Sequence, residues 1–454
     1  MDTGPLSLMR RAEDALGAAG CEASEVPGRV ALLEQCARDF EQRHHRPPTW
    51  AWWVPGRIEV FGKHTDYAGG RSLVAAVPRG FAVVAGPRDD GVVAANDVRW
   101  AASMDVRVTD QDRRYHGWAN YVAVVARRLA RNFPGAVLGA DISFASDLPR
   151  AAGLSSSSAL VVAISLALCR RGRLDERAEW GATIGDRLDL GGYLGAVENG
   201  LTFRGLAGTS GVGTFGGSED HTAILNSEPG AVGAFSYVPT RLEGRAPMPS
   251  DWRFVIATSG VEAAKAGAAL GRYNRASLGT RALVDVWQQE AGPHAGGGPG
   301  TLAEILARDA GAEDRLRGAI GRQRHVEFSA GDLARRLAHF VGENGRVLPA
   351  LDAFRSADRD ALGRLSAASQ ADAETLLGNQ IPETSALAAL AFDCGAFAAS
   401  SFGAGFGGSV WALVNAAAAP ELCVRWVAEY KRRFPAHSTA NGQVLRPGPA
   451  AVEI

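Results

Sequence analysis

Four consecutive serines, Ser155–Ser158, form the stretch whose residue types most clearly suggest chemistry. They follow Gly153 and Leu154 and precede a long apolar segment. The first N–H groups of a helix have no partner inside the helix, and serine hydroxyls beside them add further donors. A helix N-terminus also favours negative charge, so we predict an anion site here, most naturally for phosphate. No Gly-Lys-Ser/Thr closes the loop, which excludes a Walker A motif, and a serine-capped helix after an ordinary turn is the alternative.

A dense polar turn, Lys63–Tyr67, is the second candidate ligand site. The segment before it should be a strand with Ile58 and Val60 on one face and Arg57 and Glu59 on the other. Loops that rigid strands carry are favoured places for ligand contacts. A hydrophilic hairpin turn explains the same residues, so both interpretations stay open at this point.

The third candidate is a carboxylate that ends a glycine-rich run. Residues 205–218 contain many glycines and lead into Glu219-Asp220-His221. A carboxylate close to an arginine and a phosphate site would stay ionised and could orient or accept a hydroxyl proton. An acidic helix N-terminus is the alternative, because the helix dipole favours acidic residues there. The sequence alone does not place Asp220 near Arg57.

Alternating and helical hydrophobic patterns predict the elements that must position these residues. We expect strands at residues 57–61, 72–77, 81–85, 100–108, 140–146, 254–258 and 410–414. We expect helices over residues 6–43, 118–129, 160–169, 186–199, 262–283, 332–343 and 360–379. A flexible loop at 291–300 interrupts helical segments but is not taken as a domain boundary. A glycine-rich loop at 400–409 precedes a strand, the reverse of the order that a dinucleotide-binding unit needs.

Composition excludes several classes of protein. Hydrophobic residues make up 46% of the 454 residues and charged residues 21%, which is ordinary for a globular protein. The net charge of -1 gives no global field for nucleic acid or an anionic membrane. No stretch is apolar enough to span a membrane, and the N-terminus lacks a signal-peptide pattern. Five scattered cysteines without a CxxC pair predict a reduced cytoplasmic protein without a zinc site or disulfide framework.

Three motifs in fixed order resemble those of the GHMP kinases, the family of galactokinase, homoserine kinase, mevalonate kinase and phosphomevalonate kinase. Pro55–Gly70 is similar to the galactokinase sugar signature, Pro149–Ala159 to the phosphate loop and Gly403–Ser409 to the third motif. Trp118-Ala-Asn-Tyr-Val and Tyr273-Asn-Arg add further galactokinase-like sequence. The resemblance covers residues 50–415, and His64-Thr-Asp-Tyr argues against another branch such as the isoprenoid-alcohol kinases.

The resemblance implies an α+β, two-lobed GHMP kinase fold with the active site in the cleft between an N-terminal lobe, residues 1–226, and a C-terminal lobe, residues 227–454. It implies an ATP- and Mg²⁺-dependent transferase of carbohydrate metabolism, and of galactose metabolism in particular, that phosphorylates a monosaccharide at its anomeric hydroxyl. The expected partners are the sugar and ATP, with no nucleic acid and no membrane. The sugar, the nucleotide base and the oligomeric state are not predicted.

Site residues follow from the same motif positions. Asp220 takes the place of the aspartate that orients or deprotonates the sugar hydroxyl, and Arg57 that of the arginine that lowers its pKa and stabilises transferring charge. The resemblance implies sugar contacts by Arg57, Lys63, His64, Asp66, Gly217, Asp220 and Tyr273. It implies phosphate contacts by Gly153, Leu154, Ser155, Ser156, Ser157 and Ser158. It implies a magnesium site at Ser156 and Glu198.

Departures from the family pattern raise three questions. Lys63 stands where the family signature has a glutamate that contacts the far end of the sugar. We therefore hypothesise an anionic substrate such as galacturonate, the alternative being that Lys63 points to solvent. Glu219-Asp220-His221 replaces Met-Asp-Gln, which leaves Glu219 as a second candidate for the working carboxylate. Ser409 replaces a cysteine, with a packing role expected. A non-catalytic sugar and ATP sensor is the functional alternative, although Arg57 and Asp220 are both retained.

Overall fold

Two β-sheets form the framework of the molecule, for which the computed structural model describes residues 5–110, 113–149, 152–261, 268–291, 300–308 and 310–454. The larger sheet has eight strands and the smaller has four. The larger sheet runs in the order β12-β1-β2-β5-β3-β4, with β6 and β7 attached to β2. Its strands are β1 (Trp50–Phe61), β2 (Arg71–Pro87), β3 (Val92–Asp97), β4 (Ala102–Arg107), β5 (Ala140–Ser146), β6 (Ala231–Ser236), β7 (Arg241–Pro247) and β12 (Val452–Glu453).

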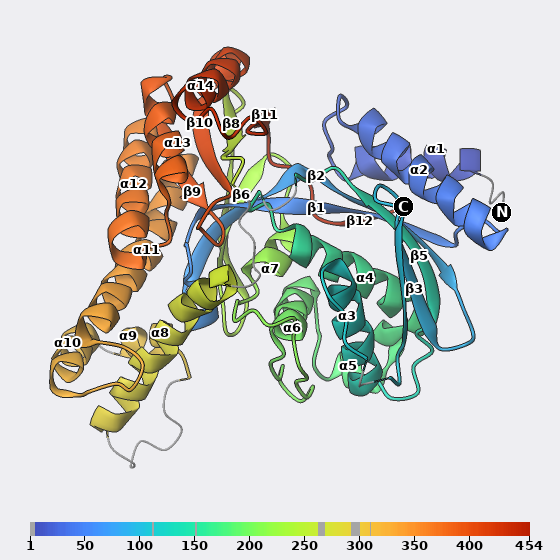
Figure 1. Ribbon diagram of the computed structural model, residues 1–454, viewed down its shortest axis with the longest axis horizontal. Coiled ribbons are helices and arrows are strands. Elements are labelled where there is room, and N and C mark those ends of the chain that lie inside the picture. The colour runs from blue at the N-terminus through green and yellow to red at the C-terminus, as the bar shows by residue number, and fades with distance from the viewer. Residues whose placement is uncertain (1–4, 111–112, 150–151, 262–267, 292–299, 309) are drawn as a thin grey trace.

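The long antiparallel pair β1 and β2 runs through the middle of the larger sheet (Figure 1). Both faces of β1 are buried, which explains its nearly continuous apolar sequence. Ile58 and Val60 lie in the main core, whereas Arg57 and Glu59 point to the opposite side, as the alternation predicts. The strands expected at 72–77 and 81–85 form the single strand β2.

Helices cover both faces of the larger sheet. On one face lie α1 (Pro5–Ala18) and α2 (Val26–His44), and the opposite face carries α3 (Trp118–Asn132), α4 (Ser156–Gly172), α6 (Arg187–Asn199) and α7 (Glu219–Asn226) (Figure 1). The single helical segment expected over residues 6–43 is wrong, because a turn with Gly20 at a φ of +83° separates α1 from α2. Short helical turns η1 (Asp66–Ala68), η2 (Leu174–Glu176) and α5 (Ala178–Gly181) join these elements.

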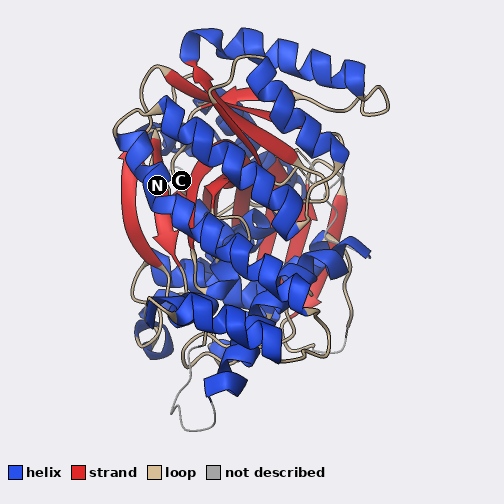
Figure 2. Ribbon diagram, turned by 90° about the vertical axis from the view of Figure 1, so that its left-hand side faces the viewer, coloured by secondary structure: helices blue, strands red, loops and turns tan. Residues whose placement is uncertain are grey.

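The smaller sheet has the order β11-β8-β10-β9, from β8 (Trp252–Thr258), β9 (Ala398–Phe402), β10 (Ser409–Asn415) and β11 (Gly442–Leu445). Alternate residues of β8 face two cores: Phe254 packs toward α11 (Ala330–Arg355) and α12 (Arg359–Asp372), and Val255 toward α13 (Pro382–Asp393) and α14 (Ala419–Arg433). Figure 2 views the molecule from the side of these helices, which lie in front of the strands. The elements α8 (Ala268–Ala291), α9 (Leu302–Arg308), α10 (Ala312–Arg322), η3 (Ala373–Leu377) and η4 (Ala416–Ala418) complete this half.

The two-lobed α+β expectation is confirmed, with differences at the edges of elements. The expected helix 360–379 ends at Asp372 and continues as the wide turn η3. Residues 262–267 of the expected helix 262–283, and 292–299 of the expected loop, lie outside the described residues. The boundary between residues 226 and 227 stays a prediction, although β6, β7 and β12 beyond it pair in the larger sheet. Among the described helices, none is long and apolar enough to cross a bilayer.

Candidate active site

Residues from both halves of the chain meet in one pocket between the two sheets. Six of the expected sugar and catalytic residues line this pocket, namely Arg57, His64, Asp66, Gly217, Asp220 and Tyr273. Glu198 and Ser158 of the expected metal and phosphate positions line it as well, and Gly403 and Ala404 of the third motif close its far side. Lys63 is the expected sugar residue that does not line the pocket.

The guanidinium of Arg57 joins the carboxylate to the phosphate loop. Its Nη2 lies 2.6 Å from Asp220 Oδ1, and its Nη1 donates to the Gly153 carbonyl oxygen at 2.6 Å. Burial acts to lower the pKa of Arg57, but Asp220, Glu219 and Glu59 together raise it above its usual value. The guanidinium therefore stays charged, with one edge on a carboxylate and another on the backbone where phosphate is expected.

Two further carboxyl groups, Glu59 and Glu219, lie beside this pair. Glu219 Oε1 is 3.4 Å from Arg57 Nε, and Glu59 Oε1 is buried without a hydrogen-bond partner. Burial, partly offset by Arg57, raises the pKa of Glu59 to about 7. Burial and the nearby Glu59 raise the pKa of Glu219 well above its usual value. Asp220 makes the shorter contact with Arg57 and has the more exposed side chain, 17% against 5%, which favours it over Glu219 for contact with a ligand.

The polar turn after β1 is fixed against the glycine-rich run. Asp66 Oδ2 accepts a hydrogen bond from the Glu219 N–H at 3.1 Å, and burial raises the pKa of Asp66. A Cβ at Gly217 would lie 2.7 Å from the Tyr67 backbone nitrogen, so only glycine fits this approach. His64, at a φ of +58°, contacts the Tyr67 hydroxyl through Nδ1 at 3.0 Å.

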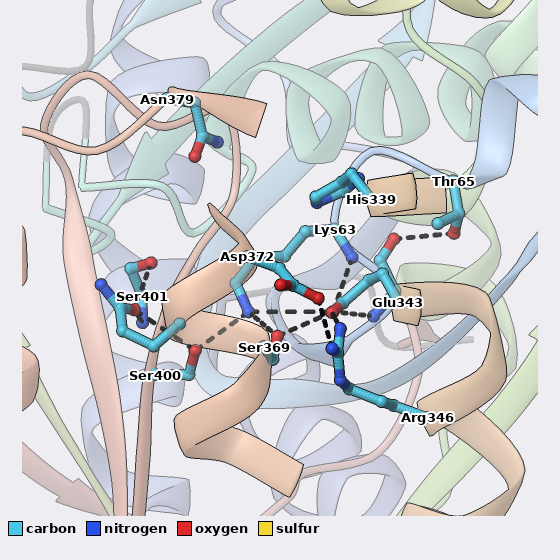
Figure 3. Close-up of polar contacts among 12 residues, drawn as sticks. Lys63, Thr65, His339, Glu343, Arg346, Ser369, Asp372, Asn379, Ser400 and Ser401 are labelled. Atoms are coloured by element: carbon cyan, nitrogen blue, oxygen red, sulfur yellow. Dashed lines mark hydrogen bonds and ion pairs between the residues drawn. The ribbon is translucent and has the colours of Figure 1, made fainter. Parts of the chain in front are cut away.

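Lys63 lies outside the pocket, in a buried cluster of the C-terminal half (Figure 3). Its Nζ donates to the hydroxyls of Ser369 at 2.6 Å and Ser400 at 3.0 Å, and lies 3.9 Å from Glu343 Oε1. The side chain is 1% exposed, so it neither reaches a sugar nor points to solvent. The expected contact between Lys63 and an anionic substrate group is therefore wrong, and so is its solvent-facing alternative.

Glu343 of α11 is the centre of this cluster. Its Oε1 accepts from the Gly62 N–H at 2.9 Å and from Ser369 Oγ at 2.9 Å, and its Oε2 lies 3.0 Å from Arg346 Nη1. Burial acts to raise the pKa of Glu343, but Lys63, the Gly62 N–H and Arg346 hold it below its usual value. We call Lys63, Glu343, Arg346, Ser369 and Ser400 the Lys63 cluster.

The phosphate loop is fixed by the residues around it. Ser155 has a φ of +58° and precedes the first residue of α4, so the serines do lie at a helix N-terminus. Arg57 N–H donates to the Leu154 carbonyl at 3.2 Å, and Ser409 Oγ donates to the Ala152 carbonyl at 2.5 Å. Ser409 thus fastens the third motif to this loop. Residues 150–151 of the motif lie outside the described residues.

The serine that meets Glu198 is Ser158. Ser158 Oγ is 2.9 Å from Glu198 Oε2 and 3.1 Å from Asp220 Oδ2. Residues two apart on a helix point in nearly opposite directions, so Ser156 does not share this orientation. The expected magnesium site at Ser156 and Glu198 stays a prediction, and Ser158 is a further candidate for it. A hydroxyl between two carboxylates offers the oxygen ligands that Mg²⁺ prefers, and His221 Nε2 lies 2.9 Å from Glu198. Over the described ranges, no three His, Cys, Asp or Glu side chains form a metal cluster by themselves.

Glu59 and Glu343 are carboxyl groups near the site to which the sequence assigned no role. Glu59 is on the same face of β1 as Arg57, so the alternation of the strand could have predicted that Glu59 lies at the site. Glu343 follows Lys63 by 280 residues and gave no local signal. All five cysteines are free, as expected from their scattered positions.

Comparisons with known proteins agree with this arrangement. The family model described as the galactokinase galactose-binding signature matches residues 38–87. The GHMP kinase N-terminal domain matches residues 120–192, and the GHMP kinase C-terminal domain matches residues 350–432. These segments contain the polar turn, the phosphate loop and the third motif, in that order.

Relatives and solved structures extend the similarity over most of the chain. A galactokinase of Chloroflexus aggregans is 28% identical over 418 residues, which is 90% of this chain and 93% of that protein. A galactokinase of Chloroflexus aurantiacus is 29% identical, over 83% and 87% of the two chains. The galactokinase of Lactococcus lactis, solved in complex with galactose, superposes with a TM-score of 0.75 at 22% identity, over 92% of this chain and 98% of that chain. That superposition supports the fold.

Proposed function

Since the chain belongs to the GHMP kinase superfamily, as a galactokinase-like sugar kinase, we propose that it transfers the γ-phosphoryl group of ATP to the anomeric hydroxyl of a monosaccharide. The observation that carries this proposal is the Arg57–Asp220 pair, 2.6 Å apart in a pocket that the phosphate loop also lines. A charged arginine beside a carboxylate suits phosphoryl transfer, in which positioning and electrostatic stabilisation dominate.

In this mechanism Asp220 orients the anomeric hydroxyl and accepts its proton. The hydroxyl oxygen forms the new bond to the γ-phosphorus while the bond to the bridging oxygen of ADP breaks. Arg57 stabilises the charge on the transferring group, because its guanidinium is fixed between Asp220 and the Gly153 carbonyl. Fixing both partners before the reaction reduces the entropy that the transition state must lose.

The serine-rich N-terminus of α4 would hold the nucleotide phosphates through the backbone of Gly153–Ser158. Mg²⁺ would be held by Glu198 with Ser158 and the phosphates, since it usually binds through few protein ligands. The ion would neutralise the charge that develops on the phosphates.

Sugar recognition is assigned to His64, Asp66, Gly217 and Tyr273, which surround Asp220 in the pocket. The relatives are named galactokinases, so galactose is the first sugar to test. A sugar-acid substrate remains a second candidate, but its recognition would not use Lys63. The alternative of a non-catalytic sensor is disfavoured, because Arg57, Asp220 and the serine loop are all present.

The test is ATP consumption with Mg²⁺ against galactose, galacturonate, glucuronate, arabinose, N-acetylgalactosamine, mannose and heptoses. Phosphorus NMR of the product would identify the phosphorylated position. We expect turnover with at least one sugar and a sugar 1-phosphate as product. Phosphorylation at another hydroxyl would contradict the proposal, and sugar binding without turnover would favour a sensor.

A further inference from the structure

A second cavity, of about 310 Å³, lies next to the pocket that contains Asp220. His64 lines both cavities and therefore marks where they meet. The second cavity is formed by α8, the start of α11, the wide turn η3 and Phe406 of the third motif. None of the roles proposed above uses this cavity.

Four arginines and one carboxylate give this cavity its charge. The charged side chains that line it are Arg272, Arg275, Arg335, Arg336 and Asp332. Asp332 lies 2.6 Å from Arg335 and 3.4 Å from Arg275, so a single carboxylate faces both of these guanidinium groups. The cavity thus carries an excess of positive charge, although the whole chain is nearly neutral.

Two of the guanidinium groups lie over aromatic rings. Arg272 is 4.4 Å from the ring centre of Phe406, and Arg275 is 4.4 Å from that of Phe328. A stacked guanidinium keeps the N–H groups of its edge available for an oxyanion, and stacking limits the freedom that binding must remove. Within the described part of the chain, Arg272 has no ion pair with a carboxylate.

Arg336 connects the cavity to the sugar signature. Its side chain is buried and donates to the His64 carbonyl, to the Tyr67 hydroxyl and to the Ala276 carbonyl. These contacts fix the wall that the two cavities share. Since His64 lines both cavities, a ligand in the Asp220 pocket that extends past His64 would reach the arginine-lined surface.

The two cavities differ in the sign of their charge. Glu59, Asp66, Glu219 and Asp220 gather around Arg57 in the first, whereas arginines dominate the second. Resting on the proposed function, we propose that the second cavity is a subsite for an anionic group that the acceptor sugar carries away from its anomeric hydroxyl. A carboxylate or phosphate has the geometry that paired guanidinium edges bind best. Specificity for a charged sugar would then come from Arg272 and its neighbours rather than from Lys63.

Titration calorimetry measures binding at this subsite independently of catalysis. Galactose, galacturonate and galactose 6-phosphate would be titrated into the wild-type protein and into Arg272→Gln and Arg335→Gln variants, with inorganic phosphate as a free-anion probe. We expect at least one charged sugar to bind more tightly than galactose, and each variant to weaken that sugar about tenfold, as loss of one charge-assisted hydrogen bond would. Galactose binding should change less than twofold.

A matched control removes an arginine elsewhere in the same half. Arg364 of α12 is exposed and does not line the cavity, so Arg364→Gln should leave every dissociation constant unchanged. The proposal is overturned if neither charged sugar binds more tightly than galactose, or if the cavity variants bind like the control. Tight binding of phosphate alone that Arg272→Gln and Arg335→Gln weaken would assign the cavity to a free anion and would also overturn it. Absence of turnover with every sugar would instead contradict the proposed function, while binding still decides on the subsite.

Discussion

Two clusters of buried polar and charged side chains, one around Arg57 and one around Lys63, differ in how fully their polar atoms are paired. In the reacting cluster, the four ionisable groups of Arg57, Glu59, Glu219 and Asp220 line the pocket, and Glu59 Oε1 has no hydrogen-bond partner. In the Lys63 cluster, Nζ of Lys63 and both oxygens of Glu343 have close partners. A cluster that satisfies itself has little capacity left for a ligand, whereas an incompletely paired one can bind or react.

The fully paired Lys63 cluster gives Lys63 a structural role, although this residue lies within the sugar signature. Glu343 accepts from the Gly62 and Lys63 N–H groups and thereby holds the start of the turn that carries His64 and Asp66. The Lys63 ammonium group, 3.9 Å from Glu343 Oε1, balances the charge of this carboxylate. The cluster thus joins the segment after β1 to α11 and α12 (Figure 3).

The largest loss of stability is expected from removing one charge of the Lys63 cluster. Lys63→Met leaves the Glu343 carboxylate buried with Arg346 as its one remaining charged partner, so we expect the free energy of unfolding to fall by roughly 3–5 kcal/mol. Urea denaturation measures this loss. In a double-mutant cycle, Lys63→Met with Glu343→Gln should lose less than the sum of the single variants. Additive losses would show that the two side chains do not interact.

Local patterns were enough to predict the strand that carries Arg57 and Glu59 and the strand and helix on either side of the phosphate loop, whereas α7, which carries Glu219 and Asp220, was not among the predicted helices. The alternation in residues 140–146 gave β5, and the apolar run after the serines gave α4. The same reasoning placed Arg57 and Glu59 on one strand face. The partners of Lys63 could not be predicted, because Glu343, Ser369 and Ser400 come from three distant elements whose approach depends on tertiary packing. The contact between Ser158 and Glu198 depends on the rotation of α4 about its axis, which sequence does not specify.

The second effect is the pH dependence of the free energy of unfolding that the buried Glu59 should cause. A carboxyl group whose pKa is about 7 in the folded protein and 4.5 as its usual value binds a proton more tightly when folded. Its contribution to stability is therefore complete below pH 4.5 and is lost as pH rises through 7. Glu59→Gln should remove this slope, which amounts to roughly 3 kcal/mol between pH 5 and pH 8. Unfolding free energies of both proteins at the two pH values would test this, and parallel pH profiles would contradict it.

The smallest expected effect, a change in kcat, tests which serine acts with Glu198 in the pocket. Ser158→Ala removes the hydroxyl shared by Glu198 and Asp220, and we expect kcat to fall about tenfold, the size of one hydrogen bond to a charged group. Ser156→Ala is the matched control, since that side chain does not meet Glu198, and it should change kcat less than threefold. Steady-state ATP consumption at saturating sugar and Mg²⁺ is the measurement. A larger loss of kcat in Ser156→Ala than in Ser158→Ala would instead support Ser156 as the residue that acts with Glu198.

The most direct test of the account compares kcat of Asp220→Asn with that of Glu219→Gln on the best sugar of the panel. The two substitutions remove neighbouring carboxyl groups around Arg57, and thermal melting would verify that both proteins are folded. We predict that Asp220→Asn lowers kcat by about 10²–10⁴-fold, the range for loss of a general base. Glu219→Gln should remain within about tenfold of wild type, because the Glu219 side chain is only 5% exposed and lies farther from Arg57, at 3.4 Å against 2.6 Å for Asp220. Near-normal turnover of Asp220→Asn would contradict the central assignment, and loss of turnover in Glu219→Gln alone would transfer the role to Glu219.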